Sequence, residues 1–474
     1  MTTSATRTQY PHIMCFVPDI KFEKLIKCYN YRWREKYVYL IHSILYPSLR
    51  NKKAFNGYVN LDSQLLIKLL GTKYYKYVLN QLMNSGIVES LKNANGKEIY
   101  SKGAFSKSYR IAEKYTTGTR IKAVPIHKQT YCRKIALARE QAMKDAFKVN
   151  PLLQHEFLQM TRRRIDVERA TIYIGQTYEQ GSKQFNARVM AIREFDAMKD
   201  ATFTQGKTNI GFHFSYNKGR VYSPASMLPR DLEQFTYFEG EYENERSVNV
   251  DMPNSQLCFF NELVKREYIG NNLYEEEKEN KKHPPKYSFS DKNNSQSLSS
   301  HHSIYHHTTT PYVFPFEQTH RTWEDYIFNG LGYERMMKLC KWKDKSEGHT
   351  KQERQEFKAE FFGQLFYNKY SDVFTDMEQV FMFYHENEAR ALREIKKKLG
   401  NKLLAVQVQS LEGKFFHHIA VDYMKTNYID VPFTIKHDSI TLPESCASFI
   451  LPELNNLVRE FFKRSDIELK AELL

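Results

Sequence analysis

The sequence predicts an α+β fold, and three observations lead to this class. Helical periodicity precedes a group of short strands near the N-terminus, helices dominate the middle of the chain, and a strand, turn, strand segment lies near its C-terminal end. The 474 residues correspond to about three domains, and a hydrophobic content of 41% is enough to form buried cores. We therefore expect a globular protein of several domains.

Residues 1–31 show little hydrophobic pattern, and we expect them to form an N-terminal arm. From residue 32 onward, apolar residues recur at the spacing of amphipathic helices. The three helices that this pattern predicts cover residues 32–47, 63–70 and 72–85. We expect the first helix to end near Pro47 and the third to end at Gly86, because proline and glycine commonly end helices.

Short strands follow around the turn Asn93–Lys97, whose Asn-Gly pair is typical of a β-hairpin. Three helices and a hairpin are the element order of a winged-helix domain, which we assign to residues 32–115. In such a domain the third helix enters the major groove of DNA and the wing contacts phosphates. The residues expected to bind DNA are Lys73, Lys76 and Asn80 on the helix and Lys107 and Arg110 in the wing. A module that contacts another protein is the alternative.

Residues 116–204 are expected to be helical, with a basic face along the helices. The basic residues of this face are Arg133, Lys134, Arg139, Lys144, Lys148, Arg162, Arg163 and Arg164. A helical arm that grips a duplex backbone would carry such a face, because phosphates attract Lys and Arg whatever the base sequence. A solvated helical surface has the same pattern.

The whole chain is basic, with 70 Lys and Arg against 55 Asp and Glu, a formal charge of +15 and a pI near 9.2. This balance favours a polyanionic partner, and nucleic acid is the first candidate. No apolar run approaches the roughly 18 residues of a membrane helix, and the N-terminal residues lack the apolar stretch of a signal peptide. The six cysteines form no C-x-x-C pair, so we expect reduced thiols and a cytoplasmic protein without a membrane partner.

Two aspartates lie at the ends of predicted strands. Asp251 ends the strand SVNV, and Asp438 lies in the turn that follows VPFTIKH. Two carboxylates on adjacent strands can hold two Mg²⁺ ions for nucleotidyl transfer, one activating a 3′-hydroxyl and one stabilising the leaving pyrophosphate. Either aspartate alone would be an ordinary turn residue, so the prediction depends on the pair.

Between the two aspartates, the segment KQERQEFKAEFFGQLFYNKYSD repeats a pattern every four residues. Arg354, Lys358, Phe362 and Phe366 therefore fall on one stripe of a helix, with two cations followed by two rings. The cations fit a triphosphate and the rings fit a base. A neighbouring stripe, which we expect to face the core, consists of Phe357, Phe361 and Leu365. An amphipathic helix with a charged outer face has the same pattern. The aspartates on either side of the segment favour the nucleotide-binding interpretation.

Five segments follow one another in a recognisable order: GRVYSPASMLP, VNVDMPNSQLCFF, R-x3-K-x3-F-x3-F, VQSLEGKFFHHIAV and TIKHDSI. Together they resemble the palm and fingers of the A-family polymerases, which include DNA polymerase I-like enzymes and the single-subunit RNA polymerases of phages and mitochondria. The resemblance covers about residues 205–455. It implies a right-hand polymerase core in residues 205–474, with a small antiparallel palm sheet and helical fingers, and a thumb-like role for residues 116–204. Residues 271–311 are polar and without periodicity, and we expect a disordered insertion there.

This resemblance also implies roles for individual residues. Asp251 and Asp438 would bind two Mg²⁺ ions, with Mn²⁺ as an alternative. The residues that it places around the nucleotide are Arg354, Lys358, Phe362, Phe366, Tyr367 and Gln256. The residues that it places at the primer and template are Gly219, Arg220, Gln409 and His437. The expected partners are a DNA primer-template and nucleoside triphosphates, and we expect a monomer.

Departures from the family pattern leave the nucleotide sugar open. The fingers motif of the family usually ends in Tyr-Gly, whereas Phe366, Tyr367 and Asn368 stand here. The DNA enzymes carry a Glu that excludes ribonucleotides where Gln256 stands, while His-Asp-Ser resembles the last motif of the RNA polymerases. We predict an exonuclease-free DNA polymerase of a phage or mobile element. The alternatives are a single-subunit RNA polymerase or primase, and a replication initiator without catalytic activity.

Overall fold

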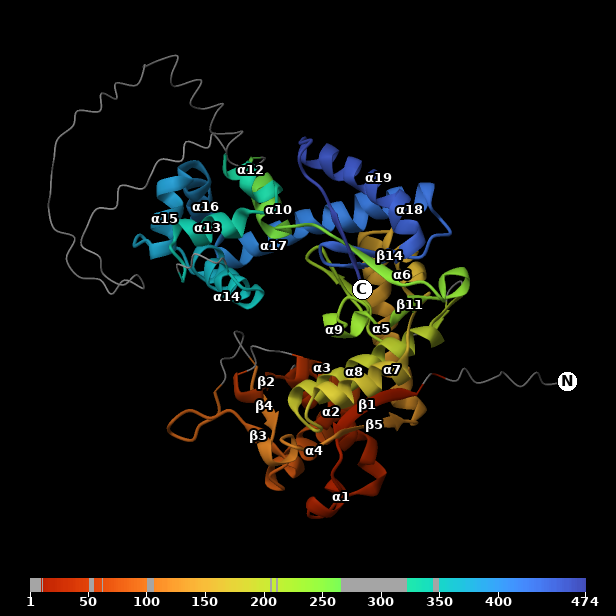
Figure 1. Cartoon of the computed structure of the whole chain (residues 1–474). Coiled ribbons are helices and arrows are strands. Elements are labelled where there is room, and N and C mark those ends of the chain that lie inside the picture. The colour runs from red at the N-terminus through yellow and green to blue at the C-terminus, as the bar shows by residue number, and fades with distance from the viewer. Residues whose placement is uncertain are drawn as a thin grey trace.

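The structure is a computed structural model, and it describes residues 10, 12–50, 55–61, 63–99, 106–204, 207–209, 212–265, 322–343 and 349–474. As predicted, the fold is α+β, with many helices and small antiparallel sheets (Figure 1). The insertion expected at residues 271–311 lies outside the described residues.

Three hydrophobic cores hold the described residues together, and they contain side chains from residues 13–135, 143–232 and 248–469. Helix α5, Gln129–Val149, joins the first two, because its first half packs in one core and its second half in the other. In the view of Figure 1, the elements of the first core lie below and those of the third core lie above.

The first core consists of β1 (Ile13–Pro18), α1 (Phe22–Leu25), α2 (Arg34–Arg50), β2 (Val59–Asn60), α3 (Ser63–Leu70), α4 (Thr72–Asn84), β3 (Val88–Ser90), β4 (Ser108–Ile111) and β5 (Ile121–Ile126). Strand β1 pairs with β5 along its full length. The expectation of an arm over residues 1–31 is therefore wrong from Ile13 onward. Cys15, Val17 and Phe22 of this segment are buried, so the hydrophobic effect fixes it to the core.

The sequence predicted that the first helix ends near Pro47, and this prediction is wrong. Helix α2 continues to Arg50. Because Pro47 lies in the last turn, its missing N–H removes only one helical hydrogen bond. The Ser48 hydroxyl donates a hydrogen bond of 2.7 Å to the carbonyl of Leu45 in this last part of the helix.

The second and third predicted helices are confirmed as α3 and α4. Gly71 between them has a φ of +88°, and Gly86 after α4 has a φ of +66°, conformations that glycine adopts most readily. The predicted Asn-Gly turn is also present, since the Asn93 N–H donates to the Lys97 carbonyl at 2.8 Å. The strands beside it form a three-stranded sheet in the order β2-β4-β3.

The second core contains α6 (Leu153–Met160), β6 (Arg163–Ile165), α7 (Val167–Thr177), α8 (Lys183–Asp196), β9 (Ser215–Asn217), β10 (Arg220–Tyr222) and α9 (Arg230–Glu233). Arg163 does not lie on a basic helical face, because it belongs to β6, which pairs with β11 (Thr236–Phe238). Its guanidinium is buried and donates to the hydroxyls of Thr236 at 2.7 Å and Thr434 at 2.8 Å. These hydroxyls replace water, so Arg163 holds the fold together and does not bind phosphate.

A four-stranded antiparallel sheet in the order β13-β14-β12-β15 lies at the centre of the C-terminal half. Its strands are β12 (Ser247–Asp251), β13 (Thr434–Lys436), β14 (Ser439–Pro443) and β15 (Lys470–Leu473). Strands β13 and β14 confirm the predicted strand, turn, strand segment. Strand β15 was not predicted, because its residues are exposed and carry no strand pattern; it pairs with β12 through the backbone.

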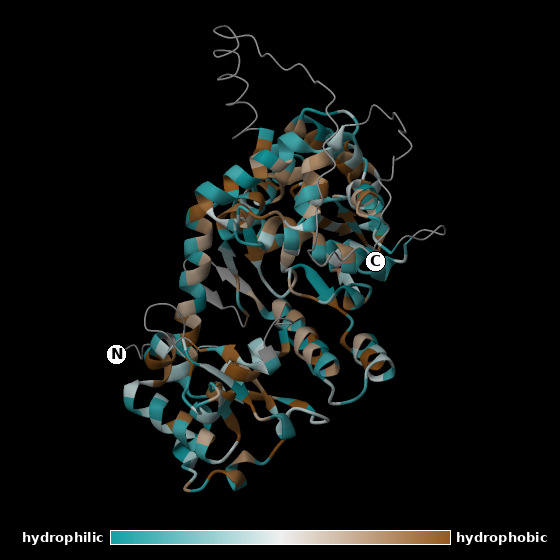
Figure 2. Ribbon diagram, turned by 90° about the vertical axis from the view of Figure 1, so that its left-hand side faces the viewer, coloured by the Kyte–Doolittle hydropathy of each residue, from teal (hydrophilic) through white to brown (hydrophobic). Residues whose placement is uncertain are grey.

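The C-terminal half also contains the helices α10 (Ser255–Val264), α12 (Trp323–Phe328), α13 (Gly332–Leu339), α14 (Lys351–Phe362), α15 (Asp376–Tyr384), α16 (Glu386–Leu399), α17 (Asn401–Lys414), α18 (Val421–Asn427) and α19 (Glu444–Phe462). Helix α19 packs against the four-stranded sheet, and in Figure 1 the helices α13 to α16 lie to one side of it. Figure 2 shows hydrophobic and hydrophilic residues side by side along the helices, as expected of helices with one buried face. In the parts of the chain that the structure describes, no helix combines the length and apolar character needed to cross a membrane.

Candidate active site

The two predicted carboxylates lie side by side at one end of the sheet. Asp251 is the last residue of β12 and is in register with Ser439, the first residue of β14. Asp438 precedes Ser439 in the two-residue turn after β13, and its carbonyl accepts a hydrogen bond of 3.2 Å from the N–H of Met252. His437 has a φ of +58°, as one residue of so tight a turn requires. The hairpin thus brings together two aspartates that are far apart in the sequence.

Both aspartates are half-buried, and both are hard to ionise in this environment. Burial, followed by repulsion from Asp438, raises the pKa of Asp251 to about 7, although Arg230 and Lys358 act in the opposite direction. Burial also raises the pKa of Asp438, while Lys358 and Arg220 favour its charged form. A cation bound between the two carboxylates would remove their repulsion, so the pair has the electrostatics of a metal site.

Helix α14 brings the predicted cation Lys358 to the same site, with Arg354 one turn before it. Lys358 lies close enough to Asp251 and Asp438 to lower the pKa of both. Arg354, one turn earlier, forms an ion pair of 2.5 Å with Glu334 of α13. Both cations are exposed, so they remain accessible to a phosphate chain that approaches the carboxylates.

Tyr333, on α13, is a site residue that sequence reasoning missed. Its side chain is 2% exposed, and the guanidinium of Arg354 and the ammonium of Lys358 lie 5.6 Å and 5.1 Å from the centre of its ring. Burial raises the pKa of Tyr333 well above its usual value, and Asp438 contributes to the same shift. Among the described residues, its buried hydroxyl has no hydrogen-bond partner. The Tyr333 ring therefore makes cation–π contacts with both cations of α14. Tyr333 lies outside the four-residue pattern of that helix, so the sequence did not point to it.

Five of the predicted residues line one small pocket between α10, α14 and α17. They are Gln256, Phe362, Phe366, Tyr367 and Gln409. The pocket has a volume of about 20 Å³, which is room for one water molecule and far too little for a base. Tyr367 is 45% exposed whereas the two phenylalanines are buried, so Tyr367 is the ring that a base would have to displace.

The helix predicted to carry the stripe from Arg354 to Phe366 is not regular in its last turn. Helix α14 ends at Phe362, and residues Gly363–Tyr367 form a π-helical turn, whose extra residue changes the spacing. Phe366 still lies beside Phe362, with ring centroids 5.0 Å apart, and it packs against Phe260 at 4.8 Å, while Tyr367 stacks on Phe362 at 5.9 Å. The neighbouring stripe is confirmed, since Phe357, Phe361 and Leu365 are all buried.

The predicted pair Gly219 and Arg220 lies in the hairpin between β9 and β10. Gly219 has a φ of +82°, and a Cβ there would lie 2.3 Å from the Gln409 carbonyl oxygen, so glycine is needed for close packing against α17. Arg220 donates at 2.9 Å to the carboxylate of Glu412, which is 2% exposed. Burial raises the pKa of Glu412, and Arg220 opposes this shift. The Arg220 and Glu412 pair therefore fixes the hairpin to α17 directly beside Asp438.

His437 is neutral near pH 7, because burial and the nearby Arg220 and Lys436 lower its pKa to about 4. Its Nδ1 atom is buried and has no hydrogen-bond partner among the described residues. A neutral imidazole with an open nitrogen can exchange hydrogen bonds with a hydroxyl group of a ligand.

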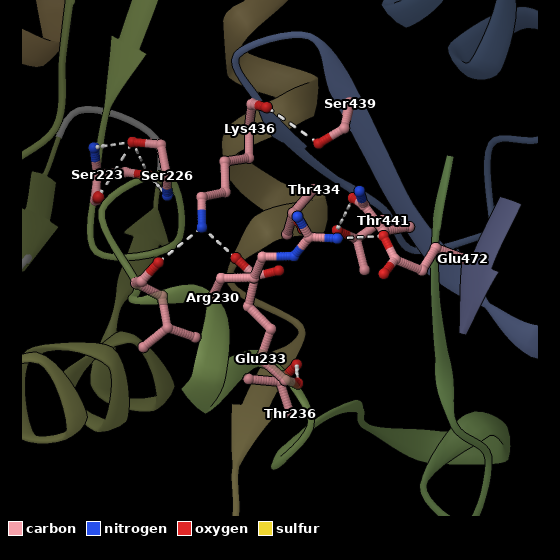
Figure 3. Close-up of polar contacts among 12 residues, drawn as sticks. Ser223, Ser226, Arg230, Glu233, Thr236, Thr434, Lys436, Ser439, Thr441 and Glu472 are labelled. Carbon is pink, nitrogen blue, oxygen red and sulfur yellow. Dashed lines mark hydrogen bonds and ion pairs between the residues drawn. The ribbon is translucent and has the colours of Figure 1, made fainter. Parts of the chain in front are cut away.

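Polar contacts that the sequence did not reveal fix the turn that carries Asp438 (Figure 3). The Lys436 ammonium pairs with Glu233 of α9 and donates to the Leu228 carbonyl at 2.6 Å. The Ser439 hydroxyl donates to the Lys436 carbonyl at 3.0 Å across the base of the turn. These contacts hold the β13-β14 hairpin against the second core.

On the other edge of the sheet, Arg230 pairs with Glu472 of β15 (Figure 3). Arg230 lies close enough to Asp251 to lower its pKa, whereas Glu472 raises it. A charge pair thus borders the carboxylates on this side. Arg230 and Glu472 are far apart in the sequence, so their ion pair could not be predicted without knowing the order of the strands.

The predicted DNA-binding residues of the first core fall into two groups. Three are exposed on α4, namely Lys73, Lys76 and Asn80. Lys107 pairs with Glu98, and Arg110 pairs with Glu89 at 2.8 Å. The α4 residues are therefore open to a partner, while the two wing residues already have carboxylates beside them.

In the described part of the chain, no three His, Cys, Asp or Glu side chains gather into a complete set of metal ligands. No protein-family model matches the chain, and no curated protein matches it either. The geometry around Asp251 and Asp438 is therefore the basis for the function proposed next.

Proposed function

We propose that this chain catalyses template-directed nucleotidyl transfer as a DNA-directed DNA polymerase of a phage or mobile element. The observation that carries the proposal is the convergence of Asp251, Asp438 and Lys358 at one half-buried site. Two carboxylates and a cation across from them are what a metal-bound triphosphate requires.

The donor set of the two aspartates fits Mg²⁺. This ion commonly binds through one or two carboxylates and completes its shell with phosphates and water, so a third protein carboxylate is not needed. Asp251 and Asp438 would hold two Mg²⁺ ions, or Mn²⁺ in their place. When bound, the ions supply the positive charge that activates a 3′-hydroxyl and stabilises pyrophosphate.

Residues of the chain would orient the substrates. Lys358 and Arg354 would bind the triphosphate, because both are exposed on α14 and Lys358 lies close to the carboxylates. Tyr367 and Phe362 would stack on the base and sugar once Tyr367 moves from its present stacked position. His437, with its neutral ring and open nitrogen, would hydrogen-bond to the primer terminus.

In this proposal the sheet β13-β14-β12-β15 is a polymerase palm, and the helices from α12 to α16 are the fingers. Residues 116–204 would be a thumb-like region, and residues 32–115 a winged-helix module. Arg220 and Gln409 would lie near the primer-template. Gly219 would act through packing, since its backbone lies against α17.

The choice of sugar would depend on Gln256, which shares the small pocket with Tyr367. A side chain of this size leaves little room for a ribose 2′-hydroxyl, which favours deoxynucleotides. A single-subunit RNA polymerase or primase is the alternative, supported by the His-Asp-Ser sequence at residues 437–439.

Primer extension with Mg²⁺, run in parallel with dNTPs and NTPs, tests the proposal. We expect Asp438→Asn and Asp251→Asn to abolish extension, because each removes a charged ligand but keeps the side-chain shape. Asp422→Asn is the matched control, since Asp422 is exposed on α18 and outside the site. Extension that survives in either site variant would exclude the proposed mechanism, and extension with NTPs alone would select the RNA polymerase alternative.

A replication initiator without catalytic activity is a second candidate, and the exposed Lys73, Lys76 and Asn80 on α4 support it. This candidate predicts tight binding to a specific repeated duplex and no nucleotide incorporation with Mg²⁺ or Mn²⁺. Gel-shift assays on the wild-type chain and on Lys73→Ala measure the duplex binding, and the absence of nucleotide incorporation distinguishes this candidate from the polymerase.

A further inference from the structure

An aromatic and basic surface lies on the first core, at the opposite end of the molecule from the catalytic sheet (Figure 1). We call it the α4 surface, and it consists of Tyr31, Trp33, Lys73, Tyr74, Lys76 and Tyr77. The lysines were predicted as DNA contacts, but the rings beside them have no role in the proposed polymerase.

Trp33, Tyr74 and Tyr77 form one ring cluster that remains open to solvent, and Tyr31, two residues before Trp33, packs its ring against Tyr29 at 4.9 Å. Tyr74 and Tyr77 pack edge to face against Trp33, with ring centroids 5.2 Å and 5.0 Å away. Tyr74 is nevertheless 42% exposed, Tyr77 40% and Tyr31 73%. An edge-to-face contact covers the face of only one of its two rings, so flat ring surfaces stay available to a partner.

The two helices at this surface, α3 and α4, are basic. Helices α3 and α4 contain Lys68, Lys73 and Lys76 and no acidic residue. Such a concentration of one charge attracts an anion, and it disfavours a second basic surface. The α4 surface therefore combines exposed rings with a positive field.

A buried lysine adds to this field. Lys36 of α2 is 7% exposed, and its ammonium lies 3.1 Å from the centre of the Tyr74 ring and 5.8 Å from that of Trp33. Among the residues that the structure describes, no carboxylate forms an ion pair with it. Burial lowers the pKa of Lys36 to about 8, and the nearby Lys128 and Lys134 lower it too. Three lysines, Lys36, Lys128 and Lys134, therefore lie near one another beside the Tyr74 ring, and a nearby phosphate would reduce their mutual repulsion.

We propose that the α4 surface binds single-stranded nucleic acid, with bases stacked on Tyr74, Tyr77 and Tyr31 and phosphates beside Lys73 and Lys76. A single strand offers both unstacked bases and phosphates, and proteins bind it with this combination of rings and cations. A duplex keeps its base faces covered, so it would use the lysines and leave the rings without partners. The site is separate from the catalytic carboxylates, and the inference goes beyond the proposed polymerase activity.

Fluorescence anisotropy on the full chain tests this inference, with a labelled oligo-dT strand and a labelled duplex hairpin as probes. We expect Tyr74→Ala/Tyr77→Ala to weaken oligo-dT binding at least about tenfold, because stacking contributes strongly for each base. Binding of the duplex hairpin should change less than twofold. Tyr74→Phe/Tyr77→Phe keeps the rings and should bind oligo-dT like wild type.

Two further variants make the result specific to this surface. Phe383→Ala removes another exposed ring, 79% exposed on α15, and should leave oligo-dT binding unchanged. Lys73→Gln/Lys76→Gln should reduce the slope of log affinity against log salt by about 1.4, or about 0.7 for each lost phosphate contact. The inference is overturned if the alanine pair binds oligo-dT like wild type, or if it loses duplex affinity as strongly as oligo-dT affinity. Primer extension on the same variants tests the polymerase separately, because Asp251 and Asp438 are intact in them.

Discussion

Two buried groups of charge in the C-terminal half differ in how the fold balances them. Between α15 and α16, Glu378 and Lys396 form an ion pair of 3.0 Å with both side chains at most 6% exposed. Burial acts to raise the pKa of Glu378, but the N–H of Thr375 and the Lys396 ammonium outweigh it, so the pKa is lowered. Asp251 and Asp438 carry the same sign of charge, and both of their pKa values are raised.

This difference separates structural charge from candidate functional charge. A fold gains stability when a buried carboxylate has a cation and N–H donors beside it, as Glu378 has. A pair of carboxylates that repel each other costs stability, and such an arrangement is common where a cation or substrate completes the site. The comparison predicts opposite responses to mutation at the two places.

The largest expected effect is on activity at the carboxylate pair. Asp438→Asn should reduce primer extension by about three orders of magnitude, because the proposed mechanism needs the charge of this half-buried carboxylate to hold a metal ion. The melting temperature should not fall, since the substitution removes repulsion. Primer-extension assays and thermal unfolding of the same preparation give the extension rate and the melting temperature. A clear loss of stability would show that Asp438 is a structural charge.

The ion pair should respond in the reverse way. Glu378→Ala leaves the Lys396 ammonium buried without its carboxylate, and we expect a loss of about 3–5 kcal/mol in the free energy of unfolding. Glu378→Leu/Lys396→Met is the control, because removing both charges should restore much of the stability. Urea unfolding measures both variants. If Glu378→Ala abolished primer extension but unfolded like wild type, Glu378 would be a functional charge, and the distinction drawn here between structural and functional charges would be wrong.

A smaller effect is expected at Tyr333, which connects the two cations of α14 to the carboxylate site. Tyr333→Leu removes cation–π contacts with Arg354 and Lys358, each of which contributes about 0.5–2 kcal/mol. We expect the KM for the nucleotide to rise about tenfold, with a smaller change in kcat. Tyr333→Phe keeps the ring and should retain the wild-type KM. Equal effects of both substitutions would instead assign the role to the hydroxyl.

The parts of the site that sequence predicted are those with local patterns. Helical spacing located the α3 and α4 helices and the buried stripe Phe357, Phe361 and Leu365, and strand ends located Asp251 and Asp438. The polymerase roles assigned by resemblance stay predictions, and the experiments above test them.

The rest depends on contacts between distant segments, which no local pattern encodes. Glu412 looks like any other helical glutamate until the β9-β10 hairpin places Arg220 against it. Arg163 looked like part of a basic run, and only the strand pairing of β6 shows that it is buried. The π-helical turn after Phe362 was missed because a single extra residue in one turn leaves no signature in the sequence.

The smallest effect concerns protons and metal at the carboxylate pair. The pKa of Asp251 rises from 3.8 to about 7 on folding, so the folded chain binds more protons than the unfolded chain between these values. The resulting stability is present at low pH and is lost as the pH rises through 7. Mg²⁺ prefers the ionised carboxylates, so at about pH 8 and ten times its Kd it should add about 1.4 kcal/mol of stability, and much less at about pH 5.5. Thermal unfolding with and without Mg²⁺ measures this, with Asp251→Asn/Asp438→Asn as the control. A Mg²⁺ effect that persists in the control, or that does not weaken at low pH, would show that the ion binds elsewhere than at Asp251 and Asp438.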